Sequence, residues 1–429
     1  MELFGEATVA DPYAVFGELR ERDPVHWSDE VDAWVLTRFA DVRAVLHDQR
    51  FSSRVLDGSP SAPATSPPGP AADTRTSRVL AGAYTFVNNS LVFSDPPQHT
   101  RLRRLVGQAF LPSAVEALAP VVEHHTRRLL DAAGTRFDVV TDLAEPLPIA
   151  VLGELLGVPL LDGDARRLKT ACDDFLLPWG RDVSSLSDDE NRRAVAASSA
   201  LGAFVDTVLT QRGNAAPDDV VGRLLAGEAD ERLTHEELFA TIVLLLIAGH
   251  ENLTSLLGNG VLWLLDLPEL RALLGEQPDQ WPAVIDELLR LITPNQFIRR
   301  VAREDVRLGG RTIRAGDATV LVLAAANRDP QHFPDPDRLV LDRTERRDVA
   351  LGQGPHYCLG APLARLEARI ALRELLERHP ALEPAGTPRY APNLNLRMLT
   401  ALPVSSSPDR TTPSHENRAA FPSDSPGRG

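Results

Sequence analysis

Residues 351–360 decide how this chain is interpreted, and they read LGQGPHYCLG. Three glycines surround one cysteine, Cys358, and a helical pattern follows from about Pro362. Glycine lets the backbone approach a flat ligand closely, and proline suits the first turn of a helix. Cys358 is therefore predicted at a helix N-terminus, where exposed N–H groups and the helix dipole favour a thiolate that can bind a metal ion.

The other cysteine, Cys172, is interpreted as a buried, inert side chain. Two cysteines are too few for a disulfide framework and fit a reducing compartment. The N-terminus lacks the basic start and apolar run of a secretory signal, so a cytoplasmic protein is expected. The most apolar run, residues 239–248, is too short to cross a bilayer of ~30 Å, which predicts a buried helix and no membrane partner.

Composition and periodicity indicate a folded, mainly α protein with a small β-rich portion. The 429 residues are 43% hydrophobic and carry a net charge of −15, which argues against disorder and against general nucleic-acid binding. Strands are predicted at 306–308 and 319–322, with a turn at Gly309-Gly310. We expect one domain over 1–403, a flexible insertion over 57–76 that forms a substrate-access loop, and a disordered Ser/Pro-rich tail over 404–429.

The longest predicted helix begins at Thr234 and continues to about Leu265 before Pro268. Thr234 and Glu237 have the spacing of a capping box, and a helix of this length would span roughly 48 Å and cross the whole protein. Halfway along it, residues 248–252 read AGHEN, which places small and polar side chains in an apolar segment. Because buried polar groups need partners, this anomaly predicts a functional site.

The 351–360 segment closely resembles the haem-binding loop of the cytochrome P450 superfamily, Phe-x-x-Gly-x-(His/Arg)-x-Cys-x-Gly. It departs once, with Leu351 at the position of the Phe. Further segments follow in the family's order, so that the resemblance runs from about Asp11 to Pro403. It implies the P450 fold, with a long central helix over a haem b whose iron is bound by the Cys358 thiolate.

The resemblance also implies the residues that hold the haem and the fold around it. The expected haem contacts, four of which are donors to its propionates, are His99, Arg103, Arg300, His356, Gly352, Gly354 and Gly360. Glu287 and Arg290 match the family's Glu-x-x-Arg, a buried structural pair that an arginine further along the chain completes. Arg338 is our choice for that third member, with Arg343 as the alternative.

Residues 248–252 resemble the family's Ala-Gly-x-(Asp/Glu)-Thr, in which Ala248 and Gly249 would open a groove for dioxygen and Glu251 would supply protons. Asn252 replaces the alcohol, and an amide donates hydrogen bonds but relays protons less readily than a hydroxyl. Four interpretations of Asn252 are open. It would order a water molecule that relays protons, or a substrate hydroxyl would complete the relay. Alternatively, the enzyme would catalyse another reaction such as oxidative coupling, or Asn252 would have no special role. Thr254 lies on a different face of the helix and is not expected to substitute.

The implied activity is that of a monooxygenase that hydroxylates or epoxidises a small, largely apolar specialised metabolite with dioxygen. Its pocket would be lined by residues 85–91 and by Leu244, Ile247, Ala248, Gln296 and Phe297. The implied partners are a ferredoxin and its reductase, and the protein is expected to be a monomer. A basic docking patch would comprise Arg103, Arg104, Arg365 and Arg369. The alternatives are a substrate tethered to a carrier protein, oxidative coupling or rearrangement, and a non-catalytic haem sensor.

Overall fold

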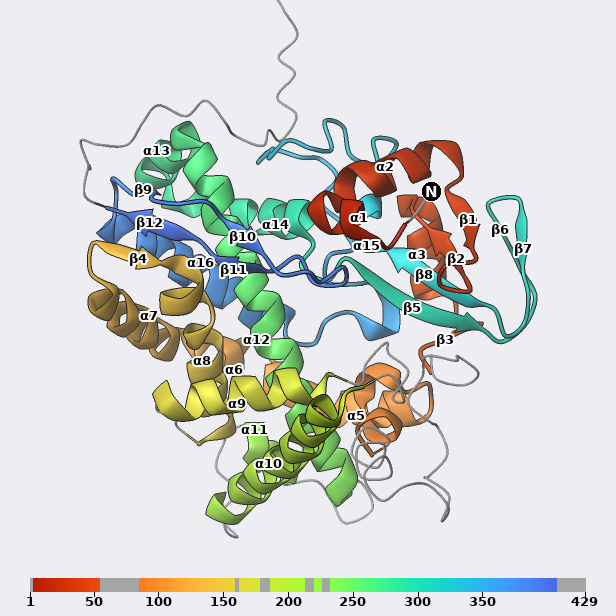
Figure 1. The fold of residues 1–429 in the computed structure, drawn as a ribbon, viewed down its shortest axis with the longest axis horizontal. Helices are drawn as coiled ribbons and strands as arrows, with labels where there is room; N and C mark the ends of the chain where they lie inside the picture. Colours follow the sequence, from red (N-terminus) through yellow and green to blue (C-terminus); the bar gives the residue numbers. More distant parts are fainter. Residues whose placement is uncertain are drawn as a thin grey trace, which may run out of the picture.

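A computed structural model describes residues 3–54, 85–158, 162–177, 186–212, 220–225 and 232–406 (Figure 1). Its longer helices are α2 (Pro12–Arg22), α3 (Phe39–His47), α5 (Gln98–Gly107), α7 (Ala119–Ala133), α8 (Pro146–Leu156), α9 (Asp162–Phe175), α10 (Asp188–Arg212), α12 (His235–Asp266), α13 (Pro268–Glu276), α14 (Trp281–Ile292) and α16 (Ala361–Arg378). Shorter helical segments are α1 (Glu6–Ala10), η1 (Leu91–Phe93), η2 (Gln108–Phe110), α6 (Pro112–Glu116), η3 (Val140–Ala144), α11 (Val220–Leu225), η5 (Pro278–Gln280), α15 (Leu323–Ala326) and η6 (Gly354–His356).

The strands form a minority of the fold, as predicted. They are β1 (Val25–Ser28), β2 (Ala33–Leu36), β3 (Phe51–Ser52), β4 (Arg136–Asp138), β5 (Phe297–Ala302), β6 (Val306–Leu308), β7 (Arg311–Ile313), β8 (Ala318–Val322), β9 (Glu383–Pro384), β10 (Arg389–Tyr390), β11 (Leu399–Ala401) and β12 (Pro403–Ser405). The largest sheet has the order β1-β2-β8-β5-β3, and the expected turn at Gly309-Gly310 joins β6 to β7.

Helix α12 crosses the centre of the molecule, with α9, α10 and α11 near one end and α13 near the other (Figure 1). The capping box is confirmed, since Thr234 Oγ1 accepts from Glu237 N at 3.2 Å and Glu237 Oε2 accepts from Thr234 N at 3.0 Å. By length and apolar composition alone this helix could span a membrane. However, 67% of its most apolar window is buried inside the protein, as expected for the core helix of a globular fold.

Two hydrophobic clusters meet along α12, and two others cover the faces of the five-stranded sheet. The largest joins α7, α8, α14 and α16 to α12, and the second joins α9 and α10 to it. On the sheet, Leu36 and Leu321 face the cluster that contains α3, whereas Val35 and Val320 face the N-terminal cluster. This division follows from the alternation of side chains along a strand. Both α12 and the sheet are therefore held in place by buried apolar packing.

The predicted start of the C-terminal tail at residue 404 is wrong. Val404 is fully buried, and β12 pairs with both β4 and β9, because Val404 completes the apolar face that Phe137 begins. Residues 407–429 and the predicted access loop at 57–76 lie outside the described residues.

Candidate functional site

The loop before α16 carries Cys358 as predicted. Helix α16 begins at Ala361, with Pro362 in its first turn, and Gly352 and Gly354 adopt φ angles of +67° and +71°. Cys358 N donates to Leu351 O at 2.9 Å, which closes the loop upon itself. A Cβ added at Gly354 would lie 2.5 Å from Leu46 O, so this glycine permits α3 to approach the loop.

The acidity of Cys358 depends on opposing influences. Burial raises the pKa of the Cys358 thiol above its ordinary value, while the N–H groups of Gly360 and Ala361 and the charges of Arg365 and Arg103 lower it. The expected helix N-terminus is therefore present, but burial outweighs it. A bound metal cation reverses this balance because it deprotonates a coordinating thiol. The residue is suited to a metal-bound thiolate rather than a free one.

Three basic side chains gather beside this loop, and the anion that acts on them, Asp95, also pairs with Arg303. The rings of His99 and His356 lie 4.0 Å apart between centroids, His99 is 2% exposed, and its Nε2 has no partner among the described residues. Burial lowers the pKa of Arg300 to about 10, and its Nη1 donates to the Arg299 carbonyl. Burial and the nearby charge of Arg300 lower the pKa of His356 to about 3.

Arg103 joins this group from α5, because its Nη2 donates to Tyr357 O at 2.8 Å. Arg300 is buried and shares Asp95 with Arg303, and His99 Nε2 has no partner among the described residues, so this group can still bind carboxylates. Two carboxylates placed here would accept hydrogen bonds from the arginines and from His99. The donor set therefore fits the two propionates of a haem b whose iron would lie near Cys358.

Sequence reasoning missed two residues that support this cluster. Ser53 Oγ lies 2.9 Å from His356 Nε2, and Ser53 N donates to Asp95 Oδ1 at 2.9 Å. Asp95 also pairs with Arg303, so its charge is already compensated. No local sequence pattern links Asp95 to Ser53, which lies more than forty residues earlier in the chain.

On α12, the small and polar segment borders accessible space. Ala248 is exposed although the helix around it is largely buried. Asn252 Nδ2 donates to Ala248 O at 3.2 Å, which fixes the amide along this face. Burial, with the charge of Asp173, raises the pKa of Glu251 to about 7 against the lowering effect of Lys169. Glu251 can thus gain and lose a proton near neutral pH.

Gly249, Thr254 and Cys172, which lie near this segment, have structural roles. A Cβ at Gly249 would lie 3.0 Å from Leu152, so this glycine allows α8 to pack closely on α12. Thr254 Oγ1 donates to Ala144 O at 3.0 Å, away from Asn252, which agrees with the expectation that Thr254 does not replace the missing alcohol. Cys172 is 1% exposed and burial raises its pKa to about 12, as an inert thiol requires.

The expected pocket residues are only partly brought together. Leu244 and Ile247 lie on α12, eight and five residues before Asn252. Gln296 is 1% exposed, and its Nε2 donates to the carbonyls of Ile292 and Thr293, so it caps the end of α14. The Phe297 ring packs edge-on against Phe4 at 5.7 Å, on the sheet face opposite Arg300. The structure therefore places Phe297 with the N-terminal cluster rather than beside α12.

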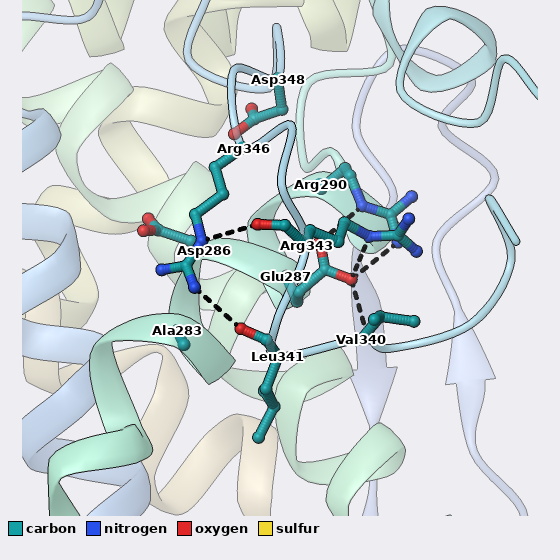
Figure 2. A pocket seen from close by; sticks show the side chains of 9 residues that line it. All are labelled: Ala283, Asp286, Glu287, Arg290, Val340, Leu341, Arg343, Arg346 and Asp348. Atoms are coloured by element: carbon teal, nitrogen blue, oxygen red, sulfur yellow. Dashed lines mark hydrogen bonds and ion pairs between the residues drawn. The ribbon is translucent and has the colours of Figure 1, made fainter. Parts of the chain in front are cut away.

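The Glu-x-x-Arg cluster is buried, and its third member is Arg343 rather than Arg338. In Figure 2, dashed lines join Glu287 to Arg290 and to Arg343. Glu287 accepts from Arg290 Nε at 2.8 Å and from Arg343 Nε at 2.9 Å. Arg338 exposes its side chain and contributes only its backbone carbonyl, which accepts from both arginines. The path of the irregular segment after α15 determines which arginine reaches Glu287, and the spacing of the arginines in the sequence did not reveal this path.

The expected basic patch is weaker than its sequence suggests. Arg365 Nε donates to Asp286 Oδ1 at 2.8 Å and its Nη1 donates to Tyr357 Oη at 3.2 Å. Arg103 donates to Tyr357 O, so both arginines already have hydrogen-bond partners within the chain. Tyr357 and Leu111, at 38% and 50% exposure, add apolar surface to this side of the molecule.

Comparison with known proteins agrees with this geometry. A family model described as cytochrome P450 matches residues 281–403. The cytochrome P450 monooxygenase PikC of Streptomyces venezuelae is 36% identical and covers 93% of this chain and 92% of its own length. Nocardicin C N-oxygenase of Nocardia uniformis subsp. tsuyamanensis is 36% identical over 91% of this chain and 93% of its own length. The structure of P450BioI with a hexadec-9Z-enoic acid-ligated acyl carrier protein matches with 32% sequence identity and a TM-score of 0.81. The match covers 93% of this chain and 100% of the P450BioI chain.

Similarity over nearly the whole length to proteins named oxygenases removes the alternative of a non-catalytic haem sensor. The fold, the cysteine loop and the cationic cluster are all accounted for by one family. The chain belongs to the cytochrome P450 family, which uses haem b with a cysteine thiolate as its axial ligand, and it is a P450 monooxygenase.

Proposed function

We propose that this enzyme hydroxylates or epoxidises a small, largely apolar specialised metabolite with dioxygen and with electrons delivered by a ferredoxin. The observation that carries the assignment is the group of basic side chains His99, His356 and Arg300 beside Cys358, in which Arg300 is buried and His99 Nε2 has no partner among the described residues. These residues and Arg103 would hold the haem propionates, and Cys358 would bind the iron. The haem, when bound, supplies the reductive activation of dioxygen.

The protein's own part is the supply of protons. Glu251, with its pKa raised to about 7, would release a proton at its carboxylate and recover one from solvent. Asn252 is held by its hydrogen bond to Ala248 O, which leaves its amide oxygen and second N–H for a water molecule. Among the readings of Asn252, the ordered relay water agrees best with this geometry, because Thr254 is engaged by Ala144.

The substrate class is supported by the apolar side chains Leu244 and Ile247 near Ala248 and by relatives named for specialised metabolites. These relatives include mycinamicin IV hydroxylase/epoxidase of Micromonospora griseorubida and 6-deoxyerythronolide B hydroxylase of Saccharopolyspora erythraea. A carrier-tethered substrate is the second candidate, because P450BioI was solved with an acyl carrier protein. We further propose a cytoplasmic monomer that is reduced at the side of Tyr357 and Arg369.

The first experiment tests the cofactor site on the purified, haem-loaded chain. The carbon monoxide adduct of the reduced protein should show the red-shifted band of thiolate ligation, and Cys358→Ala should lose it. Arg300→Leu should retain less haem, because the propionates lose a buried cation. Full haem retention with an unchanged band in Cys358→Ala would overturn the ligand assignment.

The second experiment identifies the substrate. Metabolites are screened by the optical change that follows displacement of water from ferric iron, and products are then identified with a surrogate reductase. Free acids and their carrier-bound forms are compared in parallel. An optical change confined to carrier-bound forms would favour the second candidate over the first.

Proton delivery is tested with a matched pair on one helix. Glu251→Gln should slow product formation while leaving the substrate-induced optical change intact. Glu236→Gln, in the first turn of α12, serves as the control because Glu236 is distant from Asn252 along the helix. Unchanged turnover in Glu251→Gln would refute the assignment.

A further inference from the structure

A second cluster lies where α9 passes α12, outside the haem contacts described above. An oxygen of Asp173, a ring nitrogen of His250 and an oxygen of Glu251 lie within 4.8 Å of one another. Asp173 comes from α9, and His250 and Glu251 are neighbours on α12, so tertiary packing alone brings the three together. Acidic groups often gather on surfaces without a ligand, so the cluster needs a second observation.

That observation is the state of His250, which is 1% exposed. Its Nδ1 lies 2.6 Å from Leu246 O, and because a carbonyl only accepts, Nδ1 must carry the hydrogen. Nε2 is then left with a lone pair, and it is buried without a partner among the described residues. No described residue donates to this nitrogen, so a buried lone pair faces two carboxylates, which is an arrangement suited to a bound cation.

The charges around His250 lead to the same conclusion. Lys169 Nζ lies 2.9 Å from Asp173 Oδ2 and 3.7 Å from Glu145 Oε1. Three carboxylates, those of Asp173, Glu145 and Glu251, therefore share this single lysine, the only one in the chain. Lys169 occupies one oxygen of Asp173 and leaves the other for a ligand.

We propose that Asp173, His250 and Glu251 form a binding site for a divalent transition-metal ion such as Zn²⁺. One imidazole and two carboxylates are ligands that Zn²⁺ accepts, whereas Mg²⁺ and Ca²⁺ prefer oxygen alone. Leu246 O plays the supporting part typical of metal sites, since it holds the Nδ1–H and orients Nε2. The ligand atoms of a tetrahedral Zn²⁺ lie roughly 3.4 Å apart. The three side chains must therefore rotate to bring atoms that now lie within 4.8 Å closer together.

The site is accessible, because the Asp173 side chain is 42% exposed while His250 is buried. An ion can therefore enter from solvent past Asp173 and reach Glu251. Once bound, it would occupy the carboxylate that we propose for proton delivery, and it would stop turnover reversibly. This regulatory part rests on the proposed role of Glu251, whereas ion binding itself does not.

The test uses the full, haem-loaded chain with any affinity tag removed. Zn²⁺ binding is measured by competition with a chromophoric zinc indicator, and MgCl₂ is the comparison salt. One Zn²⁺ should bind per chain, and Asp173→Asn and His250→Gln should each weaken binding tenfold or more. Asp206→Asn is the matched control, because Asp206 faces His235 at 3.4 Å in an exposed pair that no third described ligand joins. The Zn²⁺ affinity of this variant should equal that of the wild type.

Absence of stoichiometric Zn²⁺ binding, or equal binding by Asp173→Asn and His250→Gln, would overturn the site and leave the role of Glu251 untouched. Turnover is then measured with and without Zn²⁺ and after addition of a chelator. Inhibition that the chelator reverses, and that Asp173→Asn relieves, supports the regulatory part. Binding without inhibition, in an enzyme that Glu251→Gln does inactivate, would overturn the regulatory part alone.

Discussion

Replacing Arg343 by glutamine should destabilise the protein far more than the same change at Arg338. Arg343 is almost fully buried, and its Nε donates to Glu287 Oε2 at 2.9 Å. Its other nitrogens donate to the carbonyl oxygens of Pro334, Asp335 and Arg338. Glutamine is too short to reach all four acceptors, so the change leaves buried carbonyls unpaired and weakens the charge balance of Glu287.

The size of the effect follows from what remains after the substitution. Removing one partner of a buried ion pair costs about 3–5 kcal/mol, and the lower part of this range applies because Glu287 keeps Arg290 and the Val340 N–H. The entropy of unfolding is roughly 2.1 cal/mol/K per residue, or ~0.9 kcal/mol/K for 429 residues. A loss of ~3–4 kcal/mol should therefore lower Tm by about 3–5 °C.

The assay is differential scanning calorimetry of haem-loaded protein at one fixed scan rate, because large haem proteins unfold irreversibly. Arg338→Gln is the control, since its side chain is exposed and only its backbone carbonyl enters the cluster. Its Tm should stay within about 1 °C of the wild-type value. Equal melting of Arg343→Gln and wild type, or equal loss in both variants, would refute the assignment of Arg343.

Three further predictions concern stability measured by urea unfolding. Gly354→Ala should destabilise the folded protein more than Gly134→Ala. Both glycines have a positive φ, but only at Gly354 would the added Cβ meet Leu46 O. Equal losses of stability in the two variants would show that the loop can shift. Thr234→Ala should cost about 1 kcal/mol by removing the capping box of α12, and an unchanged midpoint would contradict it. Burial raises the pKa of Glu287, but the hydrogen bond and charge of Arg290 outweigh burial and hold this pKa below its ordinary value. The ionised Glu287 therefore contributes to the stability of the folded protein above the unfolded pKa of about 4.3. This stability is lost as the pH falls through the folded pKa. Glu287→Gln should accordingly lose more stability relative to wild type at pH 7 than at pH 3, and an equal difference at both values would contradict this.

Local sequence patterns were sufficient for the helices and for the cysteine loop. The boundaries of α12 follow from its capping box and the proline after it, and both signals act within a few residues. The same is true of Cys358, whose glycines and following helix are adjacent in the chain. Patterns of this kind depend on backbone conformation, which nearest neighbours largely determine.

Distant pairings were not readable in this way. The sequence predicted Arg338 as the partner of Glu287, but the structure shows Arg343 in this role. The path of an irregular segment decides which guanidinium reaches Glu287. Phe297 faces Phe4 because the register of β5 in its sheet selects the side of each residue. Val404 was assigned to a tail because the partner strands that bury it lie elsewhere in the chain.

The sequence by itself determined the fold family, the thiolate ligand loop and the acidic position on the central helix, because each is encoded by residues close together in the chain. Only the tertiary structure decided which buried histidines lack hydrogen-bond partners among the described residues, and that Asp173 faces His250 and Glu251 across two helices. Such relations depend on desolvation and on distances between separate elements. Both quantities come into existence only when the helices and the sheet pack together.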